Sequence, residues 1–281
     1  DVVGIGALRD AGYNVVTWDP RGEWRSEGIL TLDSPDYEGR DMSHIISYLA
    51  TLPEVALDGV NDPRIGMTGA SYGGGIQLAT AAIDHRVDAI VPTIAWNSLV
   101  DVLFPRGAVN SGWGTILPGV LALTFAREHP RIFPVAIQGV LFGIAEDSDI
   151  ELVNDLGFQD QIGDITAPTL LIQGTVDTLF TLDQAHTNAL ALIEAHYFKN
   201  GMFLDDDYLL ENIAKVRDLP AVIVQGRYDM ICPIVTADKL AALWPGAEYV
   251  IVPDAGHSAM EPGIRTALIK ATESLKGRIG R

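Results

Sequence analysis

Residues 64–75 read RIGMTGASYGGG, and this stretch decides the fold class. It contains the pattern G-x-S-x-G at 69–73, between an apolar run that predicts a strand and small residues, Tyr72–Ile83, that predict a helix. Small residues are needed at such a tight strand-to-helix turn, a nucleophile elbow, because strand and helix pack closely. The turn predicts Ser71 as a nucleophile and the backbone N–H of Tyr72 as a donor to a developing oxyanion, helped by the helix dipole. A glycine-rich turn with an incidental serine is the less favoured alternative.

The rest of the chain continues the alternation of strands and helices seen at this turn. This pattern predicts a mostly parallel sheet with helices on both faces. Residues 98–160 break the alternation, because they are helical and rich in Gly and Pro. We therefore predict an α/β core formed by residues 1–97 and 161–281, with residues 98–160 as a helical cap. Strands are expected at Tyr13–Trp18, Arg64–Thr68 and Val87–Ala95 and in three later runs, PTLLIQG, AVIVQG and EYVIVP.

Two segments that lie 52 positions apart repeat one pattern. Residues 168–177 read PTLLIQGTVD and residues 220–229 read PAVIVQGRYD. Each has a proline, an apolar strand, Gln-Gly, two further residues and an aspartate. Asp177 and Asp229 each follow a strand and precede a histidine in the chain. Each is therefore a candidate for the carboxylate that orients a histidine base.

A serine nucleophile needs a general base, and His257 is the best placed of the six histidines. It lies in the loop PDAGHSAMEPG after the last predicted strand, from which a histidine reaches the elbow serine in this architecture. Asp229 lies 28 residues before His257, which leaves room for one helix and one strand. Asp177 lies 80 residues before it, and a pairing of Asp177 with His196 spans 19 residues with no second strand. The spacing favours Ser71, Asp229 and His257, with Asp177 as the alternative acid.

Composition limits the expected partners and location. The 281 residues are 48% hydrophobic and 20% charged, as in ordinary globular proteins. The net charge of −18 repels phosphate backbones, so nucleic acid is not expected as a partner. The longest apolar stretches, 116–126 and 132–145, are too short to span a bilayer, so no membrane segment is expected. The single cysteine, Cys232, and an N-terminus without a signal-peptide pattern predict a cytoplasmic location. No metal or cofactor is predicted.

The sequence resembles two branches of the α/β-hydrolase superfamily in different places. Residues 1–188 resemble the X-Pro dipeptidyl-peptidase and cocaine-esterase family in WDPRG, DSPDYEGRD, DPRIGMTGASYGGG and ITAPTLLIQGTVD. Residues 193–275 resemble prolyl iminopeptidases in EAHYFKNGMF, LPAVIVQGRYDMICP and DAGHSAMEPGI. The first resemblance implies Asp177 as the triad acid. The second implies Asp229 and His257 as the acid and the base.

The second resemblance also implies a substrate. In prolyl iminopeptidases a cap glutamate that matches Glu194 helps to bind the substrate's amino group, although a solvated glutamate on a helix is the alternative for this residue. The expected function is a serine hydrolase that releases N-terminal proline or an X-Pro unit from small peptides. One alternative is a general carboxylesterase with the same triad. The other is a truncated or fused hydrolase scaffold with little activity.

Two features depart from the family patterns. Both families carry an early loop, HGGPG in the iminopeptidases, that supplies a second oxyanion N–H, and no such motif precedes Ala7–Tyr13. The first strands of the sheet and that donor are therefore expected to be absent. Residues 21–28, RGEWRSEG, stand where the family usually has glycine-rich residues after RG. Because each half brings its own acid strand, the sequence is interpreted as a fusion or chimera of the two branches.

Overall fold

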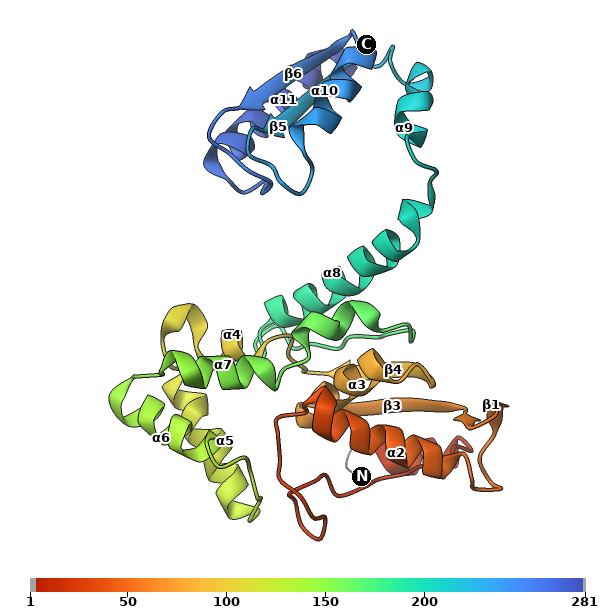
Figure 1. Cartoon of the computed structure of the whole chain (residues 1–281), viewed down its shortest axis with the longest axis vertical. Coiled ribbons are helices and arrows are strands. Elements are labelled where there is room, and N and C mark those ends of the chain that lie inside the picture. Colours follow the sequence, from red (N-terminus) through yellow and green to blue (C-terminus); the bar gives the residue numbers. More distant parts are fainter. Residues whose placement is uncertain (1–3, 280–281) are drawn as a thin grey trace. The chain divides into compact units, whose positions relative to one another are not determined.

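The computed structural model describes residues 4–279 and divides into two compact units, Asp1–Asn200 and Gly201–Arg281. Each unit contains a pair of parallel strands joined through a helix, as Figure 1 shows. Strand–helix–strand units of this kind belong to parallel sheets covered by helices. The predicted α/β class is therefore present in both units.

The sheet of the first unit is built around the elbow. β3 (Ile65–Ala70) pairs in parallel with β4 (Val87–Thr93), and α3 (Tyr72–Ile83) connects them. The pairing brings Ala70 opposite Thr93, so both strands end at the same edge of the sheet. This edge is where the serine turn leaves β3.

The first copy of the repeated segment lies along the other side of β4. Ile90 N donates to Pro168 O at 3.0 Å, and Leu170 N donates to Ile90 O at 3.0 Å. Two residues further on, Ile172 N donates to Pro92 O at 3.1 Å. The predicted strand PTLLIQG therefore forms two isolated parallel bridges with β4 rather than a continuous strand.

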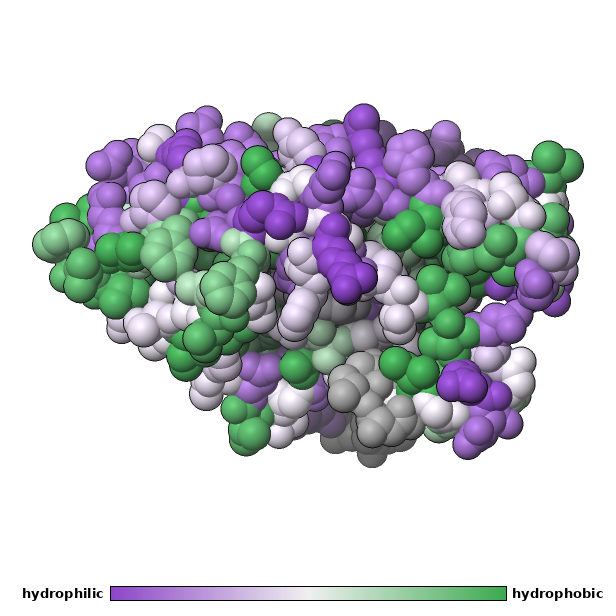
Figure 2. All heavy atoms as spheres, turned by 90° about the horizontal axis from the view of Figure 1, so that it is seen from below, coloured by the Kyte–Doolittle hydropathy of each residue, from purple (hydrophilic) through white to green (hydrophobic). Residues whose placement is uncertain are grey.

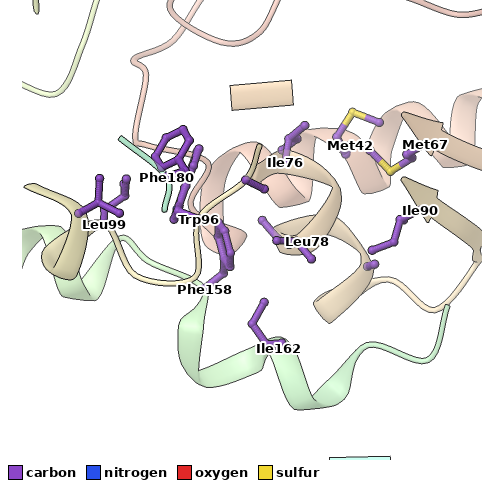
Figure 3. Packing of buried hydrophobic residues seen from close by; sticks show 14 of the residues in the cluster. Met42, Met67, Ile76, Leu78, Ile90, Trp96, Leu99, Phe158, Ile162 and Phe180 are labelled. Carbon is purple, nitrogen blue, oxygen red and sulfur yellow. The ribbon is translucent and has the colours of Figure 1, made fainter. Parts of the chain in front are cut away.

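Helix α3 is buried along most of its length, because its small residues allow close packing on both sides. All residues from Gly74 to Ala82 are buried. The helix α2 (Arg40–Leu49) contributes buried Met42 to the same core, and η4 (Gln159–Asp164) contributes buried Ile162. Figure 3 shows these apolar side chains gathered around α3.

Trp96 is the aromatic centre of this core. Its ring centroid lies 5.2 Å from that of Phe180, 5.7 Å from Phe158 and 6.1 Å from Tyr72. Tyr72 follows Ser71, and Phe180 follows the first copy of the repeat. The tryptophan therefore joins the elbow and the repeated loop within one apolar cluster, part of which is visible in Figure 3.

Residues 98–160 are helical, as predicted. The helices α5 and α6 pack against each other and, with α7, line part of an apolar pocket of about 110 Å³ whose lining includes Trp113 and Val153. Pro118 lies inside α5 and is buried. The helices of this segment are α4 (Leu99–Leu103), η3 (Pro105–Gly107), α5 (Ser111–Leu123), α6 (Ile132–Phe142) and α7 (Asp147–Asp155).

The strand expected at Tyr13–Trp18 is not formed. The segment belongs to no strand, and its largest side chains stay exposed, with Tyr13 at 66% and Trp18 at 39%. A strand requires a partner for its backbone groups as well as an apolar pattern, and here no partner lies alongside in the part of the chain that the structure describes. In residues 4–279 the first strand is β1 (Leu57–Gly59), which forms a short antiparallel pair with β2 (Asp62–Pro63).

The second unit contains the second copy of the repeat. β5 (Ala221–Gly226) pairs in parallel with β6 (Ala247–Val252), and α10 (Ile234–Leu243) connects them. The helix α11 (Pro262–Ile279) contacts both strands, and its Ile264 belongs to the unit's small buried cluster.

The remaining helices connect these parts. They are α1 (Ile5–Asp10), η2 (Pro35–Gly39) and α8 (Leu182–Lys199) in the first unit, and η5 (Gly201–Phe203), α9 (Tyr208–Glu211) and η6 (Ile213–Lys215) in the second. Among the described residues, none of the helices is long and apolar enough to cross a bilayer. The face seen in Figure 2 mixes hydrophilic residues with several groups of hydrophobic ones.

The tight packing of α3 predicts opposite effects for two neighbouring glycines. A Cβ at Gly75 would collide with the Trp96 ring and lie 2.6 Å from Asp33 Oδ2, whereas a Cβ at Gly73 meets nothing within 4 Å. Overpacking costs about 1–3 kcal/mol, and alanine in place of glycine in a helix gains about 0.5–1 kcal/mol. We expect Gly75→Ala to destabilise the first unit and Gly73→Ala to leave its stability unchanged or slightly raised.

Denaturant unfolding followed by tryptophan fluorescence measures this difference, because Trp96 lies in the affected core. Equal midpoints for the two variants would contradict the packing described for α3.

Candidate active site

Ser71 occupies a strained backbone position between β3 and α3. Its φ of 56° and ψ of −119° lie in a region that residues with a side chain rarely adopt, at a cost of about 1–3 kcal/mol. The backbone holds the turn, because Ser71 N donates to Thr93 O at 3.0 Å and Ser71 O accepts from Gly74 N at 2.7 Å. This is the geometry of a nucleophile elbow, with the serine half-buried at the edge of the sheet.

Two glycines permit this geometry. A Cβ at Gly69 would lie 2.7 Å from Gly73 O, and a Cβ at Gly74 would lie 2.9 Å from Thr93 O. Both contacts are with backbone atoms, which cannot swing aside. The glycines of GASYGG are therefore required by the close approach of the first turn of α3 to β3 and β4.

The side chain of Tyr72 anchors α3, and its backbone N–H can donate to a group outside the helix. As the first residue of α3, its N–H has no acceptor within the helix, which is the position required for an oxyanion donor. The side chain packs against Trp96, and its hydroxyl oxygen accepts from Asp33 N at 2.9 Å. Burial, followed by the nearby carboxyl of Asp33, raises the pKa of Tyr72 well above its usual value. The phenol therefore stays protonated, and the backbone is the part of Tyr72 suited to charge stabilisation.

The second unit brings Asp229 and His257 together. The Nδ1 atom of His257 lies 3.1 Å from both carboxylate oxygens of Asp229. The two residues follow β5 and β6, which end side by side with Gly226 opposite Val252. The Asp229 side chain is only 8% exposed and that of His257 is 54% exposed, so a buried carboxylate supports an accessible imidazole.

The loop around His257 is fixed by a residue that the sequence analysis missed. The Glu261 carboxylate accepts from Gly256 N at 2.9 Å and from Ser258 N at 3.2 Å, the amides on either side of His257. A side chain at Gly226 would collide with the carbonyl of Gly256, so this loop lies directly against the end of β5. A glutamate four residues after the candidate histidine was the available signal in the sequence.

Hydrogen bonds also set the charge of Asp229. Burial favours its neutral form, but the N–H of Cys232, the His257 ring and the N–H of Ile231 lower the pKa of Asp229 below its usual value. The carboxylate is therefore ionised at neutral pH, which is the state that stabilises an imidazolium.

The two copies of the repeat share one hydrogen-bond network. In the second copy, Asp229 Oδ1 accepts from the amides of Ile231 and Cys232 at 3.0 and 2.8 Å. Gln225 Nε2 donates to Asp229 Oδ2 at 3.4 Å and to Cys232 O at 3.0 Å. The glutamine of the Gln-Gly pair thus closes a loop that presents the aspartate.

The first copy repeats these contacts atom for atom. Asp177 Oδ1 accepts from the amides of Leu179 and Phe180 at 2.8 and 3.0 Å, and Gln173 Nε2 donates to Asp177 Oδ2 at 3.3 Å and also to Phe180 O. Among the hydrogen bonds of the described residues, those of Asp177 go to its own loop and none goes to a histidine.

The predicted site residues are divided between the two units. Ser71, Tyr72 and Asp177 belong to the first unit, where Glu194 lies exposed on α8. Asp229 and His257 belong to the second and contact each other. Their catalytic roles and that of Ser71 remain predictions.

The serine elbow, the parallel strand pairs and the acid and histidine loops define an α/β-hydrolase. The model of the X-Pro dipeptidyl-peptidase (S15 family) matches residues 6–131. The proline iminopeptidase of Neisseria gonorrhoeae is 45% identical over 230 aligned residues, which cover 66% of this chain and 73% of that protein. The chain therefore belongs to the proline iminopeptidase family. Both predicted resemblances are confirmed.

Other similar proteins are matched over smaller parts. A probable proline iminopeptidase of Leptolyngbya boryana is 46% identical over 38% of this chain and 34% of its own length. That of Arabidopsis thaliana is 50% identical over 35% of this chain, and the match spans 26% of its length. Among solved structures, the Pyrococcus furiosus esterase Pf2001 is 18% identical with a TM-score of 0.41, over 97% of this chain and 73% of that one.

The lowered pKa of Asp229 predicts a titration below the usual aspartate value of about 3.9. The pKa of Asp229 is lower in the folded protein than in the unfolded chain. The ionised carboxylate therefore stabilises the fold at pH values above the usual aspartate pKa, and this contribution is lost as the pH falls through the folded pKa. Carbon NMR of the Asp229 carboxyl against pH measures the midpoint.

In His257→Asn the midpoint is expected to rise toward the usual value, because one of the three hydrogen bonds is weakened. A midpoint at or above the usual value in the unsubstituted protein would contradict the described contacts.

Proposed function

We propose that the protein is a serine hydrolase that releases N-terminal proline or an X-Pro unit from small peptides. The observation that carries the proposal is the hydrogen bond between His257 Nδ1 and the Asp229 carboxylate, in a chain whose serine occupies an elbow turn. Support for the substrate class comes from the names of the relatives, which include proline iminopeptidases and an X-Pro dipeptidyl-peptidase family.

In the proposed mechanism Ser71, His257 and Asp229 act as one triad. Ser71 Oγ attacks the scissile carbonyl carbon while His257 takes the hydroxyl proton. With Nδ1 of His257 facing Asp229, Nε2 is the nitrogen that receives this proton. The N–H of Tyr72 stabilises the oxyanion. His257 then gives the proton to the leaving amine, and water hydrolyses the acyl-enzyme by the same steps.

The remaining parts of the proposal concern binding and organisation. Residues 1–97 and 161–281 form the catalytic core in this proposal, and residues 98–160 cap it. The carboxylate of Glu194 holds the substrate ammonium group. The net charge of −18 favours such cationic peptide termini over nucleic acid. A cytoplasmic location is proposed from the single cysteine.

A general carboxylesterase is the second candidate, because the motifs of residues 1–188 also resemble those of cocaine esterases. The same triad cleaves esters more readily than amides. Turnover of a short p-nitrophenyl ester, compared with proline and Gly-Pro anilides, separates the two functions. Hydrolysis of the ester alone would exclude the peptidase proposal.

Replacement of the nucleophile tests the mechanism itself. We expect Ser71→Ala to lower kcat for proline anilide by on the order of 10⁴-fold or more, because no other group forms the acyl-enzyme. Ser111→Ala, at an exposed serine that starts α5, is the control and keeps full activity. Unchanged turnover in Ser71→Ala would refute the assignment.

The loops of Asp177 and Asp229 provide a matched pair of variants that tests which aspartate is the acid of the triad. Asp229→Asn is expected to lower kcat by on the order of 10³–10⁴-fold, because an amide no longer stabilises the imidazolium. Asp177→Asn removes the same atoms from the same hydrogen-bond network and is expected to change kcat less than tenfold. Steady-state kinetics of the two variants decide the acid, and the reverse ranking would assign it to Asp177.

A further inference from the structure

Three different metal-ligating side chains meet in the loops that follow β5 and β6. Asp229, Cys232 and His257 each offer one ligand atom, and these atoms all lie within 4.8 Å of one another. We propose that this cluster binds a soft divalent cation, with Zn²⁺ as the reference ion. The proposed hydrolysis makes no use of Cys232, so the metal site adds a thiolate ligand to two residues that it shares with the proposed triad.

The ligand set fits the chemistry of zinc. Zinc takes carboxylate oxygen and imidazole nitrogen at about 2.0–2.2 Å and thiolate sulfur at about 2.3 Å, in tetrahedral geometry. Two ligands about 2.0 Å from one tetrahedral ion are about 3.3 Å apart. The 3.1 Å separation of His257 Nδ1 from the Asp229 oxygens is close to that value. A zinc-bound sulfur lies about 3.6 Å from the other ligand atoms. The ligand atoms here lie within 4.8 Å of one another, so the Cys232 sulfur has to approach the other two by up to about 1.2 Å, which rotation of an exposed side chain allows.

Part of the site is held in place before any ion binds. Asp229 is fixed by the amides of Ile231 and Cys232, so the carboxylate and the backbone that carries the thiol form one rigid loop. His257 lies in the loop that Glu261 fixes. Cys232 and His257 are both exposed, so an ion reaches them from solvent, and the net charge of −18 attracts cations.

The first copy of the repeat differs from the second in the groups that accompany the aspartate. Its loop has the same network around Asp177, but Phe180 stands where the second copy has Cys232. No described hydrogen bond joins Asp177 to a histidine. The first loop therefore offers the carboxylate alone, and it serves as an internal reference for the second.

Zinc binding affects the triad, and this step of the proposal rests on the proposed function. A cation held by His257 and Asp229 takes the imidazole lone pair and the carboxylate that the base requires. Zinc then acts as a reversible inhibitor, and a chelator restores turnover. Zinc binding itself is independent of Ser71 and of any substrate.

Titration of the 281-residue protein with Zn²⁺ alone, in competition with a chromogenic zinc indicator, tests the site without substrate. We expect one ion per chain and at least tenfold weaker binding in Cys232→Ser and in His257→Asn. Asp177→Asn, in the reference loop, and His186→Asn, at an exposed histidine outside the cluster, are the controls and keep the original affinity.

Cobalt provides a second measurement. Co²⁺ bound to a thiolate gives a charge-transfer absorption band, which we expect in the unsubstituted protein and not in Cys232→Ser. Equal zinc affinity in all variants, or no binding at all, would overturn the proposal. Ser71→Ala separates the two proposals, because it abolishes turnover and leaves zinc affinity unchanged.

Discussion

The approach of α3 to the ends of β3 and β4 is the contact on which the first unit depends. At Gly69 and Gly74 the backbones come so close that a methyl group would overlap a carbonyl oxygen. The same contact holds Ser71 in its positive-φ conformation, so the packing of α3 and the geometry of the serine turn share one cause. The stability of the helix against the sheet, distributed over residues from Gly74 to Ala82, is what offsets the local strain.

The second unit uses a different constraint to hold Asp229 and His257 together. Here the parallel pairing of β5 and β6 sets two loops side by side, and the absence of a side chain at Gly226 lets them touch. Glutamine and glutamate side chains then fix each loop from within, through Gln225 and Glu261. A buried carboxylate beside an exposed imidazole results from backbone packing, and the charge of Asp229 follows from the donors around it.

The sequence predicted those features that depend on short-range sterics or on spacing. The elbow was predictable because the glycines around Ser71 have one structural reason to be there. The meeting of Asp229 with His257 was predictable because 28 residues hold one helix and one strand. The strand expected at Tyr13–Trp18 failed because an apolar pattern does not reveal whether a partner lies alongside. Glu261 was missed because its bonds are to backbone amides, which leave no pattern in the side chains.

The duplicated loop has a consequence for how the chain tolerates change. The network of Gln173 and Asp177 stabilises a turn, whereas the identical network of Gln225 and Asp229 stabilises a turn and also positions a histidine. Under the proposed function, a substitution in the first loop affects folding alone, whereas a substitution in the second affects both folding and catalysis.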